Sequence, residues 1–399
     1  MSHSVADSTL LQSIVDAHQP DFSLYAGFYR DVHQHPEISA MEEDTAKKVV
    51  AHLERLGYTV HTGIGGHGVV GVLQNGNGGK KILMRAELDA LPIQEQTNLP
   101  YRSQRRMIDR YGNERPVMHA CGHDMNMAAL LAAADLLKSA SAKWTGTILI
   151  LFQPDEEETS GDRVPVPDLM LGQHVVPARA GTVAIKPSGP ACHGGPCENT
   201  VNPQICVDPI PLSMKIVSEL QDAVTKEIGP DQDATVACWG FWAGEPGNDY
   251  VAYADMLLDI KTVKPEIRRR VIDLIKEKFQ NDCRAAGVPR DPEFNITVRA
   301  PLTSNHDDVG GPIAHVFRAY FGEKMTEMAF TRACEDFSVL GEVHDVPYAY
   351  WNFGGTHEDV AEPVPTNHSP FFAPEVDLTL KTGTDAMALA ALTFLVAET

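Results

Sequence analysis

Residues 119–137 read His119-Ala-Cys-Gly-His-Asp124 followed by Met125-Asn-Met-Ala-Ala-Leu-Leu-Ala-Ala-Ala-Asp-Leu-Leu137. The apolar run predicts a helix from about Met125 to Ala140. Ahead of it, Cys121 and His123 stand two residues apart, a spacing that places both side chains on one face of an extended segment. Thiolate and imidazole are ligands that suit zinc or a similar first-row ion. The pair therefore indicates a metal site beside this helix, although a single cysteine is also typical of an ordinary buried thiol.

Carboxylates follow two predicted strands. The strand Lys81–Arg85 runs into a segment that carries Glu87 and Asp89. The continuous apolar run Thr147–Phe152, typical of a strand buried on both faces, is followed by Gln153-Pro-Asp-Glu-Glu-Glu158. Neighbouring carboxylates at the end of a buried strand raise one another's pKa unless a cation lies among them. These segments indicate a site at the strand ends, with an acidic loop exposed to water as the alternative.

Two further histidines lie far along the chain. His174 stands in a strand-like apolar stretch, where a single histidine is more typical of a core residue than of a ligand, and His368 stands in a polar loop. Combined with Cys121, His123 and the carboxylates at 156–158, they form a donor set large enough for two metal ions. One glutamate would remain as a base.

The composition restricts the class of protein. A chain of 399 residues with 43% hydrophobic and 22% charged residues is typical of a folded protein of about two domains. The net charge of −21 argues against nucleic acid as a partner. No apolar run is long enough to span a bilayer, and the first residues lack the pattern of a signal peptide. Seven cysteines without a repeating pattern do not indicate a disulfide framework, so we expect a cytoplasmic protein.

The distribution of elements predicts a discontinuous domain. Residues 1–186 and 305–399 alternate predicted strands and helices and form one α/β domain in two parts. Residues 187–304 begin with a stretch rich in Pro, Gly and Cys and then predict an antiparallel sheet with helices on one face. This smaller α+β domain is inserted between the two parts of the first.

One local pattern near the N-terminus predicts a helix start. Ser39-Ala-Met-Glu42 has the spacing of a capping box, in which the serine and glutamate side chains satisfy backbone N–H groups of the first helical turn. The helix that it would open carries an apolar stripe of Ala46, Val49, Val50, Leu53 and Leu56 and ends at Gly57.

Taken together, these motifs resemble the M20 family of metallohydrolases, subfamily D, which includes hippurate hydrolases, N-acyl-amino-acid deacylases and auxin-conjugate hydrolases. The matching stretches occur in the family's order and cover nearly the whole chain. They are His33-Gln-His-Pro-Glu-Ile38, Arg85-Ala-Glu-Leu-Asp-Ala-Leu-Pro92, Met118-His-Ala-Cys-Gly-His-Asp124, Phe152-Gln-Pro-Asp-Glu-Glu157, Gly172-Gln-His-Val175, Val207-Asp-Pro-Ile210, Cys334-Glu-Asp-Phe337 and Asn367-His-Ser-Pro370.

The resemblance implies a catalytic α/β domain with an inserted lid that often forms a dimer contact. It also implies two divalent ions, which could be zinc, manganese, nickel or cobalt. The implied metal ligands are Cys121, His123, Glu157, His174 and His368. The other implied roles are general base for Glu156, oxyanion stabilisation for His193, substrate binding for Asn248 and orientation of the ligands for Glu87 and Asp89.

The chain departs from the family pattern in two places that bear on the site. Asp155 and Glu158 flank the glutamate pair, where the family usually has small residues. An alternative register would make Glu157 the base and Glu158 the ligand. In the lid, residues 188–193 leave almost no room for a first strand before His193, which bears on the role of this histidine and on a homodimer through the lid.

The expected activity is therefore metal-dependent hydrolysis of the amide bond of an N-acyl amino acid or a similar small amide conjugate. A dipeptidase or carboxypeptidase on the same scaffold is the nearest alternative. Amide formation or another acyl transfer at the same site is a further alternative, because both directions pass through the same tetrahedral intermediate. A protein that has kept the fold for binding only is the alternative outside catalysis. The expected partners are a small-molecule amide as the substrate and a second copy of the chain. Neither nucleic acid nor a membrane is expected.

Overall fold

The computed structural model describes residues 7–110, 112–157, 168–192, 209–229, 234–243, 253–288, 290–296, 301–330, 335–357, 359 and 363–397. The chain forms two compact units. Unit 1 comprises Met1–Ala191, Ser304–Ala329 and Phe337–Thr399, and unit 2 comprises Cys192–Thr303 and Phe330–Asp336. Unit 1 is thus discontinuous in sequence, and the expected α/β fold with a smaller insertion is confirmed.

Unit 1 contains an eight-stranded mixed sheet. In spatial order its strands are β1 (Thr59–Ile64), β2 (Gly68–Asn75), β6 (Gly146–Gln153), β3 (Lys81–Glu87), β7 (Leu169–Arg179), β14 (Tyr348–Thr356), β8 (Val183–Ile185) and β13 (Met325–Thr326). The central strands β6, β3, β7 and β14 run parallel to one another, whereas β1 and β2 pair antiparallel with their neighbours. Strand β8 is antiparallel to β14 and parallel to β13. The carboxyl ends of the four central strands therefore share one edge, where sites of open α/β sheets are built.

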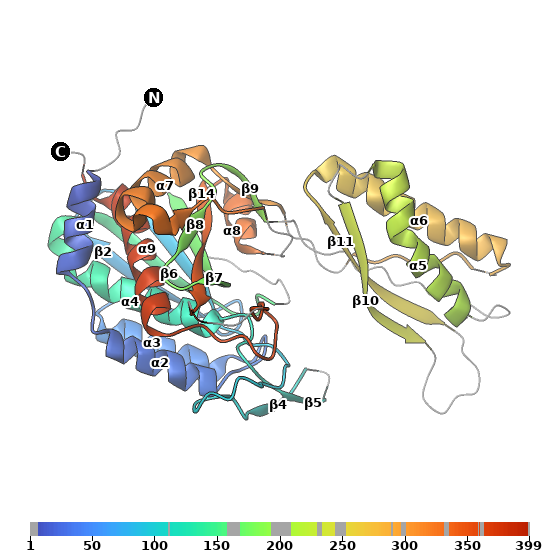
Figure 1. Ribbon diagram of the computed structural model, residues 1–399, viewed down its shortest axis with the longest axis horizontal. Coiled ribbons are helices and arrows are strands. Elements are labelled where there is room, and N and C mark those ends of the chain that lie inside the picture. Colours follow the sequence, from blue (N-terminus) through green and yellow to red (C-terminus); the bar gives the residue numbers. More distant parts are fainter. Residues whose placement is uncertain are drawn as a thin grey trace. The chain divides into compact units, whose positions relative to one another are not determined.

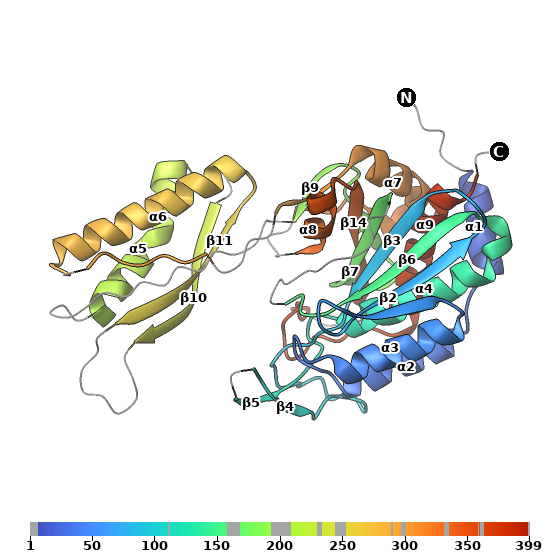
Figure 2. The same ribbon diagram turned by 180° about the vertical axis from the view of Figure 1, so that it is seen from behind.

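Two helices form the centre of the core of unit 1. They are α4 (His123–Ser139) and α9 (Asp377–Leu395), and they pack on each other and on the central strands. Nearly every residue of both helices is buried, and many are alanines, which allow close approach of the two backbones. Figures 1 and 2 show both helices on one face of the sheet. Because α4 is buried in this core, the position of its first residue, His123, is fixed.

The remaining described elements of unit 1 surround this core. The helices are α1 (Ser8–Ala17), α2 (Phe22–Gln34), α3 (Glu43–Arg55), α7 (Asp307–Phe321) and α8 (Phe337–His344), with short 3₁₀ turns at Ser141–Lys143 and Gly322–Lys324. The strands β4 (Arg106–Ile108) and β5 (Glu114–Pro116) form a hairpin. At the sequence boundaries between the two units, β9 (Gly189–Cys192) pairs with β12 (Thr303–Asn305). No helix among the residues placed in the structure is long and apolar enough to cross a membrane.

The predicted capping box at Ser39–Glu42 is wrong. Helix α3 begins at Glu43, and the side chain of Glu42 makes no capping hydrogen bond. The first turn is instead capped by Glu37, whose carboxylate accepts from the N–H groups of Asp44 (3.3 Å) and Thr45 (2.7 Å). Both residues of the predicted box bind distant parts of the chain. Oγ of Ser39 donates to Asp89, which follows β3, and the carboxylate of Glu42 accepts from the N–H of Asp155, which follows β6.

Unit 2 is a small α+β layer structure. Helices α5 (Pro209–Ile228) and α6 (Pro265–Ala285) pack on the antiparallel pair β10 (Ala234–Ala243) and β11 (Ala254–Thr262). Its core includes Leu220 of α5, Leu258 of β11 and Phe279 of α6, as expected for helices on one face of a sheet. The segment before His193, where the sequence leaves almost no room for a first lid strand, forms only the four-residue strand β9. Residues 193–208 lie outside the described residues.

Candidate metal centre and active site

The backbone brings the predicted site residues to the shared edge of the sheet. Glu87 ends β3 and Asp89 follows it, while Glu156 and Glu157 follow β6. His174 stands in β7, two residues beyond Gly172, where the pairing of β7 with β3 ends. Because these strands are parallel, three segments far apart in the sequence deliver their side chains to the same place.

The turn before α4 depends on a glycine. Gly122 separates Cys121 from His123 and has a φ of 88°, in the left-handed region that favours glycine. A Cβ at this position would lie 2.3 Å from Cγ1 of Val175 in β7. The glycine thus permits the close approach of this turn to β7, which carries His174.

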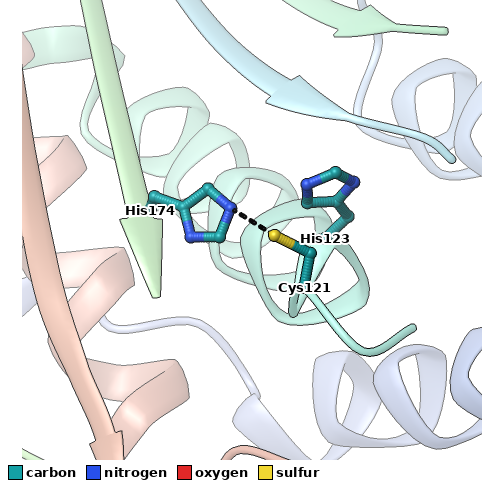
Figure 3. Close-up of side chains that lie close together, drawn as sticks. All are labelled: Cys121, His123 and His174. Carbon is teal, nitrogen blue, oxygen red and sulfur yellow. Dashed lines mark hydrogen bonds between the residues drawn. The ribbon is translucent and has the colours of Figure 1, made fainter. Parts of the chain in front are cut away.

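Cys121 lies at the centre of the candidate ligands. Its Sγ is 3.4 Å from Nε2 of His174 and 3.3 Å from Nε2 of His368. Figure 3 shows Cys121 and His174 pointing toward one another beside His123, and the two imidazole rings are 5.4 Å apart between centroids. The sulfur therefore faces imidazoles from β7 and from the loop before α9.

Two groups of potential ligand atoms share this sulfur. Cys121, His123 and His174 form one group, and Cys121, Glu157 and His368 form the other. Within each group the ligand atoms lie within 4.8 Å of one another. All five residues that the sequence suggested as ligands are thus brought together, and each of the two groups could hold one metal ion, with the thiol in common.

The hydrogen bonds of this centre test whether a cation fits. Nδ1 of His123 lies 2.9 Å from the carbonyl oxygen of Asp89, and Nδ1 of His174 lies 2.7 Å from that of Val175. A carbonyl accepts only from N–H, so each Nδ1 carries a proton, and in the neutral imidazole each Nε2 offers a lone pair to the centre. Nε2 of His123 and Oε1 of Glu157 are buried, have no hydrogen-bond partner among the described residues and lie 3.9 Å apart. Two buried acceptors facing one another fit a cation between them.

Burial sets the electrostatics of the same residues. It raises the pKa of the Cys121 thiol and that of the Glu157 carboxyl above their ordinary values. Both groups must lose a proton to bind a metal ion, so ion binding at this centre releases protons.

Glu87 and Asp89 lie behind the potential ligands. Glu87 is fully buried between the guanidinium of Arg85 and the amide of Asn126, whose Nδ2 donates to it over 2.8 Å. Burial alone would raise its pKa, but the Arg85 charge holds the pKa below its usual value. Asp89 accepts from Oγ of Ser39 (2.7 Å) and from the N–H of Glu157 (3.0 Å). Both carboxylates are thus fixed where they can orient neighbouring groups.

The two glutamates after β6 differ in their surroundings. Oε2 of Glu157 is 3.6 Å from Nε2 of His368, and Glu157 belongs to one of the groups that contain Cys121. Oε2 of Glu156 is 3.6 Å from Nε2 of His123, and Glu156 groups with Asp89 and His123 rather than with the sulfur. Glu157 thus lies with the shared sulfur, as the register with Glu157 as the ligand requires.

Three predicted residues cannot be placed. His193, the lid histidine, and Asn248, the lid asparagine, lie outside the described residues, as does Glu158, the ligand of the alternative register. Their roles remain predictions.

Asn367 is a site residue to which the sequence analysis assigned no role. Its Nδ2 donates to the carbonyl oxygens of Cys121 (2.8 Å) and Val175 (3.2 Å), so it joins the Cys121 turn to β7. The adjacent His368 has a φ of 67°, a conformation that is uncommon outside glycine and is often found at functional sites. In the sequence, Asn367 could have been found from its position next to the candidate ligand His368 in a polar loop.

Comparisons with known proteins point to one family of enzymes. Residues 83–393 match the model of the peptidase family M20/M25/M40. Over 347 residues the chain is 33% identical to a hippurate hydrolase of Campylobacter jejuni, covering 80% of this chain and 85% of that protein. Over 385 residues it is 28% identical to thermostable carboxypeptidase 1 of Saccharolobus solfataricus, covering 92% and 94%. It is similar to the crystal structure of YXEP from Bacillus subtilis, a dinuclear metal binding peptidase from the M20 family, with a TM-score of 0.73, 27% identity and coverage of 93% and 97%.

The donor set and these similarities point the same way, to an enzyme that hydrolyses amide bonds with the help of metal ions. The family model matches well over half of the chain, and the chain belongs to the peptidase family M20/M25/M40. The resemblance to its amidohydrolases, first seen in the sequence motifs, is confirmed.

Proposed function

We propose that this protein hydrolyses the amide bond of an N-acyl amino acid, using two divalent ions bound around Cys121. The observation that carries the proposal is the sulfur shared by two groups of ligand atoms. The substrate class is supported by the similarity to a hippurate hydrolase, because hippurate is itself an N-acyl amino acid.

Each ion has its own set of residues in this proposal. Cys121, His123 and His174 would hold one ion, and Cys121, Glu157 and His368 the other. Two ions of zinc, manganese, nickel or cobalt bound there would supply Lewis-acid activation of water and of the amide carbonyl. Glu87 and Asp89 would orient the ligands through the buried hydrogen bonds described above.

Glu156 is the proposed general base. It would accept a proton from the attacking water and deliver it to the nitrogen of the leaving amine. Its support is its position beside the potential ligands but outside both groups that contain the sulfur. By the family resemblance, His193 would stabilise the developing oxyanion and Asn248 would bind the substrate.

A pair of substitutions tests these roles. Glu156→Gln should retain two ions per chain by elemental analysis and lower kcat for hippurate about 10²- to 10⁴-fold. His174→Ala should lose metal, because it removes an imidazole from one group. His61→Ala, at an exposed position of β1, is the matched control and should change neither quantity. Equal metal loss in the Glu156 and His174 variants would contradict the assignment.

A carboxypeptidase or dipeptidase activity is the second candidate, supported by the similarity to a carboxypeptidase over nearly the whole chain. Pairs of substrates separate the two activities. One member of each pair carries a simple acyl group on the amide nitrogen, and the other carries an aminoacyl group with a free α-amino group. A preference for the acylated member supports the N-acyl amino acid proposal. Release of product only from free peptides would replace it.

The assembly and the setting are also proposals. We propose a homodimer through unit 2, supported by the exposed Trp239 and Trp242 on β10, which are 62% and 57% accessible. Sedimentation of the wild type and of Trp242→Ser tests it, with a monomer expected for the variant. A cytoplasmic setting would keep the Cys121 thiol reduced, as metal binding requires. Its test is the fractionation of cells that produce the protein.

A further inference from the structure

We propose that the turn Ser39–Glu42 positions the loop that carries Glu156, with Glu42 as its principal residue. Glu42 has no exposed surface, and its Oε1 accepts from the N–H of Asp155 over 2.9 Å. Asp155 immediately precedes Glu156, so this hydrogen bond fixes the backbone from which the proposed base projects. The inference rests on the proposed function in one respect, the role of Glu156.

Two buried carboxylates hold the backbone on either side of Glu156. Glu42 accepts from the N–H of Asp155, and Asp89 accepts from the N–H of Glu157 over 3.0 Å. The same turn supports both, because Oγ of Ser39 donates to Oδ2 of Asp89 over 2.7 Å. These two contacts restrain the backbone of the loop on both sides of Glu156.

The backbone held by Glu42 is unusual. Asp155 has a φ of 57° and Ala40 has a φ of 64°, both in the left-handed region that residues other than glycine seldom adopt. The N–H groups of both residues donate to the same oxygen, Oε1 of Glu42, at 2.9 and 2.8 Å. One carboxylate oxygen therefore stabilises two residues in an uncommon backbone conformation, Ala40 in the turn and Asp155 in the loop that carries Glu156.

Helix capping does not account for the burial of Glu42. The first turn of α3 is capped by Glu37, which accepts from the N–H groups of Asp44 and Thr45. Oε2 of Glu42 is buried and has no hydrogen-bond partner among the described residues, an unfavourable environment for a carboxylate. The side chain does make the contact with Asp155, so we assign to Glu42 the role of holding the loop that carries Glu156.

The test compares Glu42→Ala with Glu42→Gln. The alanine variant removes the acceptor, whereas the oxygen of glutamine can accept from the same two N–H groups. Four quantities are measured: metal ions per chain, kcat, KM, and hydrogen exchange of the peptide that contains Asp155. Glu43→Gln is the matched control, because Glu43 is an exposed glutamate at the start of the same helix.

We expect Glu42→Ala to lower kcat about 10- to 100-fold, with KM within about threefold of wild type and two ions per chain retained. The amide of Asp155 should lose protection from exchange. Glu42→Gln should restore most of kcat and the protection, and Glu43→Gln should match the wild type. A merely structural role for Glu42 would not predict this separation of kcat from KM and metal content.

Three outcomes would overturn the proposal: kcat and exchange unchanged in Glu42→Ala, metal lost in proportion to activity, or no recovery in Glu42→Gln. If Glu42→Ala does not fold, Ser39→Ala decides, because it removes only the hydroxyl bound to Asp89. Its expected effect is a decrease in kcat of about 3- to 10-fold at constant metal content, and no decrease would overturn the proposal. If the wild type cleaves no N-acyl amino acid, the proposed function fails, while exchange at Asp155 still tests the positioning contact.

Discussion

The two sides of the candidate site are held in different ways. His123 and His174 stand on α4 and β7, and their ring orientations are fixed by main-chain carbonyls. Glu156 and Glu157 stand in a loop whose backbone is held by the side chains of Glu42 and Asp89. The imidazole side is thus part of the core, whereas the carboxylate side depends on a few hydrogen bonds from backbone N–H groups to side-chain oxygens. Changes on the first side should alter metal binding or folding, and changes on the second should alter turnover.

Removal of the shared sulfur should have the largest effect. Because Cys121 belongs to both groups of ligand atoms, Cys121→Ala should lose both ions and reduce kcat/KM by at least about 10³-fold. Elemental analysis and hippurate assays measure the two quantities. Cys283→Ala is the matched control, since Cys283 is a buried thiol in the core of unit 2. Two ions per chain in Cys121→Ala would show that the sulfur is not a shared ligand.

Gly122→Ala should destabilise the imidazole side. The new methyl group would meet Val175 at 2.3 Å with a φ of 88°, so we expect a loss of about 2–5 kcal/mol in the free energy of unfolding. Urea denaturation of the wild type and the variant measures it. Gly78→Ala is the matched control, because Gly78 has a φ of 99° but no atom within 4 Å of the place that the new methyl group would take. A loss no greater than that of the control would mean that the turn adapts.

Residues that the sequence predicts well are those whose neighbours are set by strand order. The parallel strands β3, β6 and β7 bring Asp89, Glu157 and His174 together, and their positions at or after strands were visible in the sequence. The Ser39–Glu42 pattern misled because a capping box is defined by local spacing alone. In the fold, Ser39 binds a partner 50 residues away and Glu42 one 113 residues away, and these tertiary contacts replace the local ones.

His33 should make the stability of the imidazole side depend on pH. It is buried in α2 and joins Asp124 of α4 (2.6 Å) to Glu95 (3.1 Å). Burial alone would lower its pKa, but the two carboxylates raise it to about 9. Since this exceeds the ordinary value of 6.5, the stabilisation is complete below about pH 6.5 and is lost as the pH rises through 9.

The contribution of His33 is roughly 3 kcal/mol at most. It is measured as the difference in unfolding free energy between the wild type and His33→Gln from pH 6 to pH 10. We expect the difference to shrink as the pH rises. His35→Gln, at an exposed position one residue beyond α2, is the control. A difference independent of pH would show that His33 is neutral in the folded protein.

Arg110→Ala should have the smallest effect, and it tests how much of the carboxylate side depends on exposed contacts. Arg110 donates to Oδ1 of Asp155 over 3.3 Å, and its side chain is 40% accessible to solvent. Exposed ion pairs contribute about 0–1 kcal/mol, so kcat should fall by less than about threefold. The buried contact of Asp155 with Glu42 would then hold the loop without Arg110. A decrease as large as that of Glu42→Ala would mean that the hairpin β4–β5, rather than the Ser39–Glu42 turn, positions the proposed base.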